Sequence, residues 1–130
     1  MSKRAYLTLE SWKLVRGIYG ELPMRVSFFK GLPWFVTRPL VEGITLGENI
    51  YLVPDATVDV VVHELYHAVN QKMAAGVIPW FLRPAYFRYA LLFVLNGFSY
   101  SRHPMEKAAR EFATKNLTLQ QSQIRALREG

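Results

Sequence analysis

Apolar residues recur every three or four positions between residues 57 and 76, which predicts an amphipathic helix. Thr57 is a typical helix-capping residue, Asp59 falls in the first turn, and Lys72 and Gly76 are typical of a helix end. The apolar face of this helix consists of Val58, Val61, Val62, Leu65, Ala68, Val69 and Met73. We therefore expect a helix from Thr57 to Gly76 with one buried face.

Helical spacing is also found near both ends of the chain. Leu9, Trp12, Val15 and Ile18 predict a short helix from Thr8 to Gly20. A looser spacing of leucines and isoleucine among polar residues predicts a final helix from Asn116 to Gly130, which packs on the domain or binds a partner.

Period-two and β-branched runs predict strands before the long helix. Met24–Phe29 and Trp34–Arg38 are short β-prone runs separated by Gly31-Leu32-Pro33. Ile44–Leu46 and Asn49–Val53 flank Gly47-Glu48, which predicts a β-hairpin that leads directly into the helix.

The segment from Val77 to Gly97 is rich in aromatic residues. Arg83, Pro84 and Arg88 interrupt it, and its clean apolar run is far shorter than the roughly 20 residues that a transmembrane helix needs. We expect a buried helix here, because a small domain needs these side chains for its core. The alternative is an exposed face that docks on a partner, a second copy or a membrane surface through Val77 to Phe98.

The predicted long helix carries the sequence His63-Glu64-Leu65-Tyr66-His67. Two histidines four residues apart lie on the same side of a helix and can bind one Zn²⁺ ion. Glu64 then lies beside the metal as a general base that takes a proton from the attacking water. The alternative is an ordinary amphipathic helix with two histidines and a glutamate at its edge.

A catalytic zinc normally has three protein ligands, so a third ligand must come from another part of the chain. We rank Glu106 first, His103 second and Glu111 third. Pro104 suits the first turn of a helix, which places Glu106 in that turn. Ala109 and Ala113 would share its face and allow close helix packing. The alternative for Glu106 is a first-turn carboxylate that only stabilises the helix dipole.

Two further residues are candidates for a catalytic role. His103, where it is not a ligand, could stabilise the oxyanion formed during hydrolysis, and the hydroxyl of Tyr100 could do the same. The alternative for Tyr100 is a buried aromatic residue with a satisfied hydroxyl.

The chain resembles a largely uncharacterised family of small bacterial and phage HExxH metallopeptidases of the gluzincin type. The resemblance covers roughly residues 40–114 and is carried by Gly43–Pro54, by the motif helix, and by Tyr100 with His103–Arg110. In that family a Pro-x-Glu pattern supplies the third zinc ligand, and Pro104-Met105-Glu106 matches it. Lys107 stands where members often have another acid, so the resemblance implies different neighbours for Glu106.

The composition of the chain narrows the number of domains, the kinds of metal site and the partners that we expect. At 130 residues, with 51% hydrophobic residues, the chain is expected to form one domain spanning residues 1–130. The absence of cysteine excludes disulfides and thiolate metal ligands. The net charge of +6 comes from scattered basic residues, so we expect no specific nucleic-acid binding. The N-terminal residues lack an apolar run typical of a signal peptide, which predicts a cytoplasmic protein, with a phage product or a piece of a larger secreted assembly as alternatives.

Together these features predict an α+β, zincin-like domain, in which a small antiparallel sheet packs on the HExxH helix and three further helices follow. The predicted function is zinc-dependent hydrolysis of a peptide bond in a protein or peptide substrate. The alternative is a non-catalytic protein-interaction module that binds zinc for stability.

Overall fold

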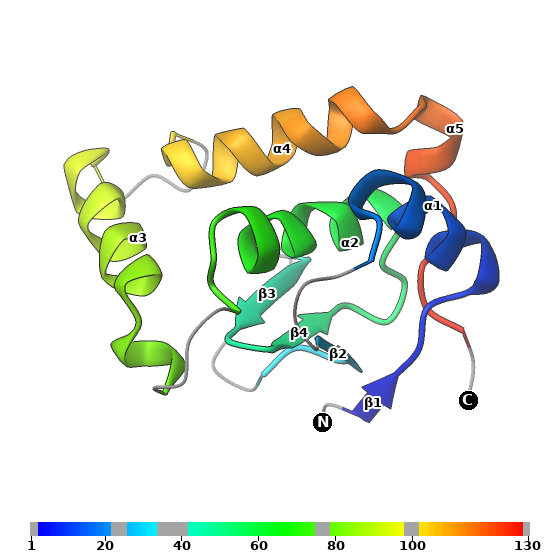
Figure 1. The fold of residues 1–130 in the computed structure, drawn as a ribbon, viewed down its shortest axis with the longest axis horizontal. Coiled ribbons are helices and arrows are strands. Elements are labelled where there is room, and N and C mark those ends of the chain that lie inside the picture. Colours follow the sequence, from blue (N-terminus) through cyan, green and yellow to red (C-terminus); the bar gives the residue numbers. More distant parts are fainter. Residues whose placement is uncertain (1–2, 22–25, 34–41, 75–78, 98–101, 129–130) are drawn as a thin grey trace.

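The computed structural model describes residues 3–21, 26–33, 42–74, 79–97 and 102–128 (Figure 1). Within these ranges the chain forms a four-stranded sheet and five α-helices, so its class is α+β, as the sequence predicts. Short π-helical and 3₁₀ segments join the helices.

The sheet has the strand order β1-β2-β4-β3. Its strands are β1 Lys3–Ala5, β2 Ser27–Lys30, β3 Gly43–Leu46 and β4 Asn49–Leu52. The predicted hairpin is confirmed, because β3 and β4 are antiparallel and Gly47 in the turn has a positive φ of 65°. β2, however, runs parallel to β4, so the sheet is mixed and the prediction of an antiparallel sheet is wrong. The alternation of apolar and polar side chains along a strand shows which face of the strand is buried. It does not show whether the neighbouring strand runs parallel or antiparallel.

Two other predicted strands have different outcomes. The run Met24–Phe29 contributes to β2, which begins at Ser27 and ends at Lys30. The run Trp34–Arg38 lies outside the described residues.

The motif helix α2, Val58–Leu65, lies between the sheet and α4, Pro104–Asn116 (Figure 1). The apolar face predicted for this part of the chain is buried apart from the half-buried Val69, and Val61 and Leu65 are fully enclosed in the core. A π-helical segment, Tyr66–Asn70, continues the helix. The helical segment therefore ends at Asn70 and not near Gly76, because Lys72 has a φ of 62°, which right-handed helical backbone cannot adopt.

Segments near the two ends of the described chain pair with each other beside α2. The predicted N-terminal helix is confirmed as α1, Leu9–Tyr19, with Thr8 as its N-cap. The predicted final helix is wrong: α5 spans only Leu119–Ser122, and the chain beyond it is extended. Leu127 forms a bridge with Leu7 and is buried, so pairing with other segments replaces helical hydrogen bonds there.

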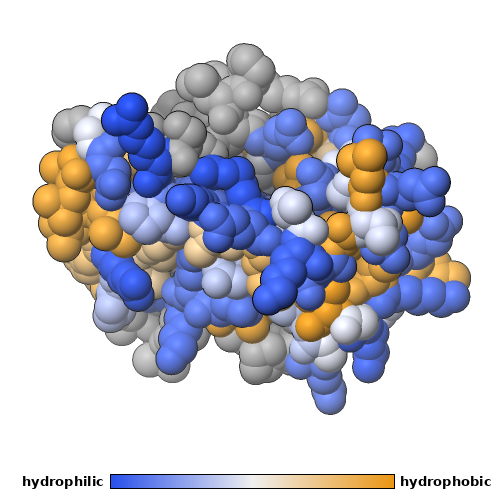
Figure 2. Space-filling model, turned by 90° about the horizontal axis from the view of Figure 1, so that it is seen from above, coloured by the Kyte–Doolittle hydropathy of each residue, from blue (hydrophilic) through white to orange (hydrophobic). Residues whose placement is uncertain are grey.

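Helix α3, Pro84–Leu95, lies at one end of the molecule (Figure 1). Contrary to the prediction of a buried helix, none of its residues is buried. Apolar atoms gather on the surface at this end (Figure 2), from Phe81, Leu82, Phe87, Leu91, Val94 and Leu95. The inner side of α3 instead faces the sheet and motif helix through a cavity described below. No described helix is long and apolar enough to cross a membrane.

Candidate metal centre

The two motif histidines come together at the point where α2 passes into the π-helical segment. His63 is in the last turn of α2, and His67 is in the π segment. Their Nε2 atoms are 3.3 Å apart. π-Helical turns are rare and are often found at functional sites, because they shift side chains out of the regular helical positions.

Glu106 approaches both histidines from the first turn of α4. Its Oε1 atom lies 2.7 Å from Nε2 of His63 and 2.9 Å from Nε2 of His67. Ala109 and Ala113 are buried, which allows α4 to pack closely along α2. The structure therefore brings together the three residues that the sequence ranked first as metal ligands.

The donor set fits a zinc ion. Two imidazole nitrogens and one carboxylate oxygen are the ligands of a common class of catalytic zinc site. Four ligands about 2.0–2.1 Å from zinc in a tetrahedron lie about 3.3 Å from one another, and the two histidine nitrogens are 3.3 Å apart. The two distances to Glu106 are a few tenths of an ångström shorter, because these groups are hydrogen-bonded directly to each other.

Glu106 and His67 shift each other's proton affinity. Burial alone would raise the pKa of Glu106, but hydrogen bonds from His63 and His67 hold it well below its usual range. Burial would lower the pKa of His67, yet the hydrogen bond to Glu106 and the charges of Glu64 and Glu106 raise it to about 9. In the metal-free protein a proton on His67 thus balances the buried carboxylates, and a metal cation would take its place.

Glu64 lies in the cleft between α2 and strand β3. It is only 4% exposed, and burial raises the pKa of its carboxyl group. The hydroxyl of Thr45 donates to its Oε1 atom over 2.9 Å. A carboxylate with a raised pKa is a stronger base than one in water, which suits a proton acceptor.

The carboxylate of Glu64 also lies near the histidines, since donor atoms of His63, Glu64 and His67 are within 4.8 Å of one another. Glu106 is nevertheless the better placed third ligand, because one of its oxygens contacts both ring nitrogens directly. Glu64 is held instead by Thr45, on the side of the sheet.

Two of the other sequence candidates, His103 and Glu111, do not reach the histidine pair. His103 is fully buried as the N-cap of α4; its Nδ1 accepts from the backbone N–H of Met105, and its Nε2 lies 2.8 Å from the carbonyl oxygen of Tyr89. Both ring nitrogens are thus used by the backbone, so the structure gives no support to His103 as ligand or oxyanion donor. Glu111 lies on the exposed side of α4. Tyr100 lies outside the described residues.

Two residues that the sequence did not single out hold the candidate ligands in place. Nδ1 of His67 donates to Oε1 of Gln71 over 2.6 Å, and Nε2 of Gln71 donates to the carbonyl of Met105. The hydroxyl of Tyr89 donates to Oε2 of Glu106, and the Tyr89 ring stacks on His103. Gln71 thereby directs Nε2 of His67 towards the site, as hydrogen-bonded partners of metal ligands commonly do.

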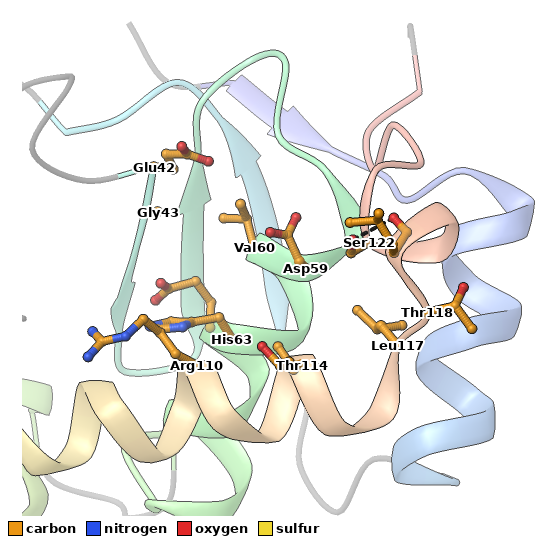
Figure 3. A pocket seen from close by; sticks show the side chains of 13 residues that line it. Glu42, Gly43, Asp59, Val60, His63, Arg110, Thr114, Leu117, Thr118 and Ser122 are labelled. Carbon is orange, nitrogen blue, oxygen red and sulfur yellow. Dashed lines mark hydrogen bonds between the residues drawn. The ribbon is translucent and has the colours of Figure 1, made fainter.

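Two cavities meet at the centre. A cavity of about 700 Å³ lies between α2, α4 and α5 and is called the polar cavity here, because charged and hydroxyl side chains lie among the apolar ones in its wall. Figure 3 shows His63 and Arg110 at one end of it and Thr118 and Ser122 at the other. An apolar cavity of about 510 Å³ lies between β3 and α3 and is bordered by His67 and Glu106. Gly43 and Glu64 line both cavities, so a chain that passes Glu64 can occupy both.

No protein-family model, curated protein or solved structure matches this chain. The family resemblance given above therefore stays a prediction, and the geometry of the site is the basis for the function proposed below.

Replacing Gln71 by alanine is expected to lower zinc affinity by about 10- to 100-fold, because His67 loses the partner that orients its ring. Competition with a chromophoric chelator measures the affinity. Asn70→Ala, which removes the neighbouring exposed amide, is the matched control and should leave it unchanged. Equal affinities for both variants would show that Gln71 does not orient the ligand.

Replacing Gly43 by alanine is expected to destabilise the protein by about 1–3 kcal/mol. A Cβ atom there would lie 3.0 Å from Cγ of Glu64 and 3.0 Å from Cδ2 of Leu52. Gly17→Ala is the control: a Cβ atom meets nothing within 4 Å in helix α1, so this change should stabilise by about 0.5–1 kcal/mol. Urea denaturation of both variants measures the difference. A Gly43 variant as stable as the wild type would mean that β3 can move away from Glu64.

Proposed function

We propose that this chain is a zinc-dependent peptidase with a zincin-like fold. His63, His67 and Glu106 are the proposed zinc ligands, and Glu64 is the proposed general base. The observation that carries the proposal is the direct contact of Glu106 with both motif histidines, beside a buried carboxylate at the junction of two cavities. When bound, zinc lowers the pKa of a water ligand to about 7 and polarises a carbonyl group.

Glu64 takes the proton of the attacking water in this proposal and passes it to the leaving amine. Its Oε1 atom accepts from Thr45, and its second oxygen is the proposed proton acceptor. Burial raises the pKa of the group and so strengthens it as a base. Gly43 allows β3 to approach Glu64 closely, which keeps the carboxylate in one position.

The substrate is proposed to lie along β3. This strand is at the edge of the sheet and borders both cavities through Gly43. An extended peptide can add to such an edge through backbone hydrogen bonds. A peptide in this position passes Glu64 and the ligand set.

Metal content and cleavage together test the proposal. Mass spectrometry should find one zinc ion per wild-type chain and none after His63→Ala, whereas Glu111→Ala, an exposed acid on the same helix as Glu106, should keep it. The zinc-loaded wild type should cut bonds in a mixed peptide library, and His63→Ala should not. Failure to bind zinc, or zinc binding without any cleavage, would contradict a peptidase.

A zinc-stabilised interaction module is the second candidate, favoured by the exposed apolar residues of α3. It predicts bound zinc, loss of folding on chelation, and no cleavage. The peptidase instead retains its fold through the two apolar clusters around α2 when zinc is removed. Circular dichroism with a chelator, together with the peptide assay, distinguishes the two.

A further inference from the structure

The large apolar side chains that line the cavity beside the metal centre come from four separate parts of the described chain. Leu46 comes from β3, Met73 from the segment after the π turn, Trp80 from the 3₁₀ turn, and Phe93 from α3. Its volume of about 510 Å³ is within the range of small-molecule and side-chain binding sites.

Among the described residues that line this cavity, every hydroxyl group is already hydrogen-bonded within the protein. Thr45 donates to Glu64. The hydroxyl of Tyr86 donates to the carbonyl of Thr45 over 2.6 Å and accepts from the N–H of Gly47 over 2.7 Å. The hydroxyl of Tyr89 donates to Glu106. The hydrogens of these hydroxyl groups are therefore all engaged and cannot be donated to a polar substrate group without breaking a bond within the protein.

The charged and imidazole groups that border the cavity belong to the metal centre itself. They are Glu64, His67 and Glu106, and each is bound to another residue of the site or to Thr45. The indole N–H of Trp80 can donate but cannot accept a hydrogen bond. An acidic side chain in this cavity would lose its hydration beside the carboxylates of Glu64 and Glu106. A basic side chain could pair only with these same carboxylates among the described lining residues, and it would then occupy the proposed general base or zinc ligand.

Tyr86 fixes the size of the cavity. Its two hydrogen bonds join α3 to strand β3 and to the β3–β4 turn, and its ring packs against Trp80 with centroids 5.1 Å apart. These contacts hold α3 at a fixed distance from β3, although the outer side of the helix is exposed. The cavity is therefore preformed.

We propose that this cavity binds a large apolar side chain of the substrate, of the size of leucine or phenylalanine, next to the bond that is cleaved. The inference rests on the proposed peptidase function, because the cavity borders the same Glu64, His67 and Glu106. The remainder of the substrate chain passes Glu64 into the polar cavity, where Arg110, Thr114 and Ser122 line the walls (Figure 3).

Binding of single amino-acid amides tests the cavity without any cleavage. The metal-free protein, labelled with 5-fluorotryptophan, is titrated with the N-acetyl amides of phenylalanine, leucine, lysine and glutamate. The ¹⁹F resonance of Trp80, assigned with Trp80→Phe, should shift saturably with the two apolar amides and at least tenfold more weakly with the charged ones. Equal binding of all four, or no shift with the phenylalanine amide, would overturn the inference.

Replacing Ala90 by phenylalanine narrows the opening of the cavity. Ala90 lies on α3 at the cavity rim and is exposed, so Ala90→Phe can fold. Binding of the phenylalanine amide should fall at least tenfold. Leu91→Phe places a ring on the exposed side of the same helix and should leave binding unchanged. Equal loss in both variants would show that the ligand binds to the outer surface of α3.

Cleavage of a mixed peptide library by the zinc-loaded protein then separates the two proposals. Large apolar residues next to the cut should be enriched about 10- to 100-fold over charged ones, and Ala90→Phe should shift the preference towards small residues. Cleavage without this preference would overturn the inference and leave the peptidase standing. No cleavage, with the apolar amides still selected, would overturn the peptidase function, and the cavity would then be a site for a non-substrate apolar ligand.

Discussion

Replacing Glu64 by glutamine is expected to lower peptide hydrolysis by about 10²- to 10⁴-fold, the usual contribution of a general base, while one zinc ion stays bound. Glutamine has nearly the same shape as glutamate, and its amide oxygen can still accept from Thr45. It cannot take a proton from water. Initial rates on a peptide identified from the library, with metal content measured on the same sample, test this.

The zinc content of Glu64→Gln distinguishes a general base from a metal ligand. The Glu64 carboxylate lies within 4.8 Å of both histidine donors, so it is the nearest competitor of Glu106 for the third ligand position. Loss of zinc in Glu64→Gln would therefore make Glu64 a ligand. Full activity would remove it from the mechanism. Glu111→Gln, at an exposed position of α4, is the control and should change neither rate nor metal content.

The sequence was sufficient to place the candidate ligands on their helices. Histidines four residues apart face the same way on any helix, and a proline followed two residues later by Glu106 fixes that glutamate in a first turn. Buried alanines then bring the two helices together. These are local rules, which act over three or four residues, and the contact of Glu106 with both histidines agrees with them.

The residues that hold the ligands could not be found in this way. Gln71 reaches Nδ1 of His67 at the end of the π-helical segment, which ends in a backbone turn at Lys72. Tyr89 reaches Glu106 only because α3 lies beside the start of α4. Nothing in the spacing of apolar residues reports a π turn or the position of a neighbouring helix. The same holds for Thr45, whose hydroxyl on strand β3 donates to Glu64 on helix α2.

The prediction that α3 is a buried helix is wrong for a related reason. Its composition is apolar on most sides, which favours burial by the usual rule for small domains. The structure uses only the side with Tyr86, Tyr89 and Phe93, which lines the apolar cavity, and leaves Phe87 and Leu91 exposed. The apolar composition of α3 therefore predicts that the helix contacts an apolar surface. It does not show whether that surface is the protein core, a ligand or a partner.

Replacing Glu106 by alanine is expected to lower zinc affinity by more than 100-fold, beyond the 10- to 100-fold that loss of a ligand's hydrogen-bonding partner costs. Tyr89→Phe is the matched variant for that smaller loss, because it removes only the hydrogen bond to Oε2 of Glu106. Competition with a chelator ranks the wild type, Tyr89→Phe and Glu106→Ala. Unchanged affinity in Glu106→Ala would pass the ligand role to Glu64, since Glu111 is exposed and both nitrogens of His103 are used by the backbone.

The metal-free form of the Glu106 variant gives an independent result. Burial lowers the pKa of His67, and the hydrogen bond to Glu106 is the largest of the effects that raise it to about 9 in the wild type. Without Glu106, burial is opposed mainly by the charge of Glu64, so the pKa of His67 should fall towards or below its usual value near 6.5. An NMR titration of the His67 ring between pH 5 and 10 measures this. A pKa that stays near 9 would show that Glu106 does not contact His67 in solution, and the ligand set proposed for zinc would then lack its third member.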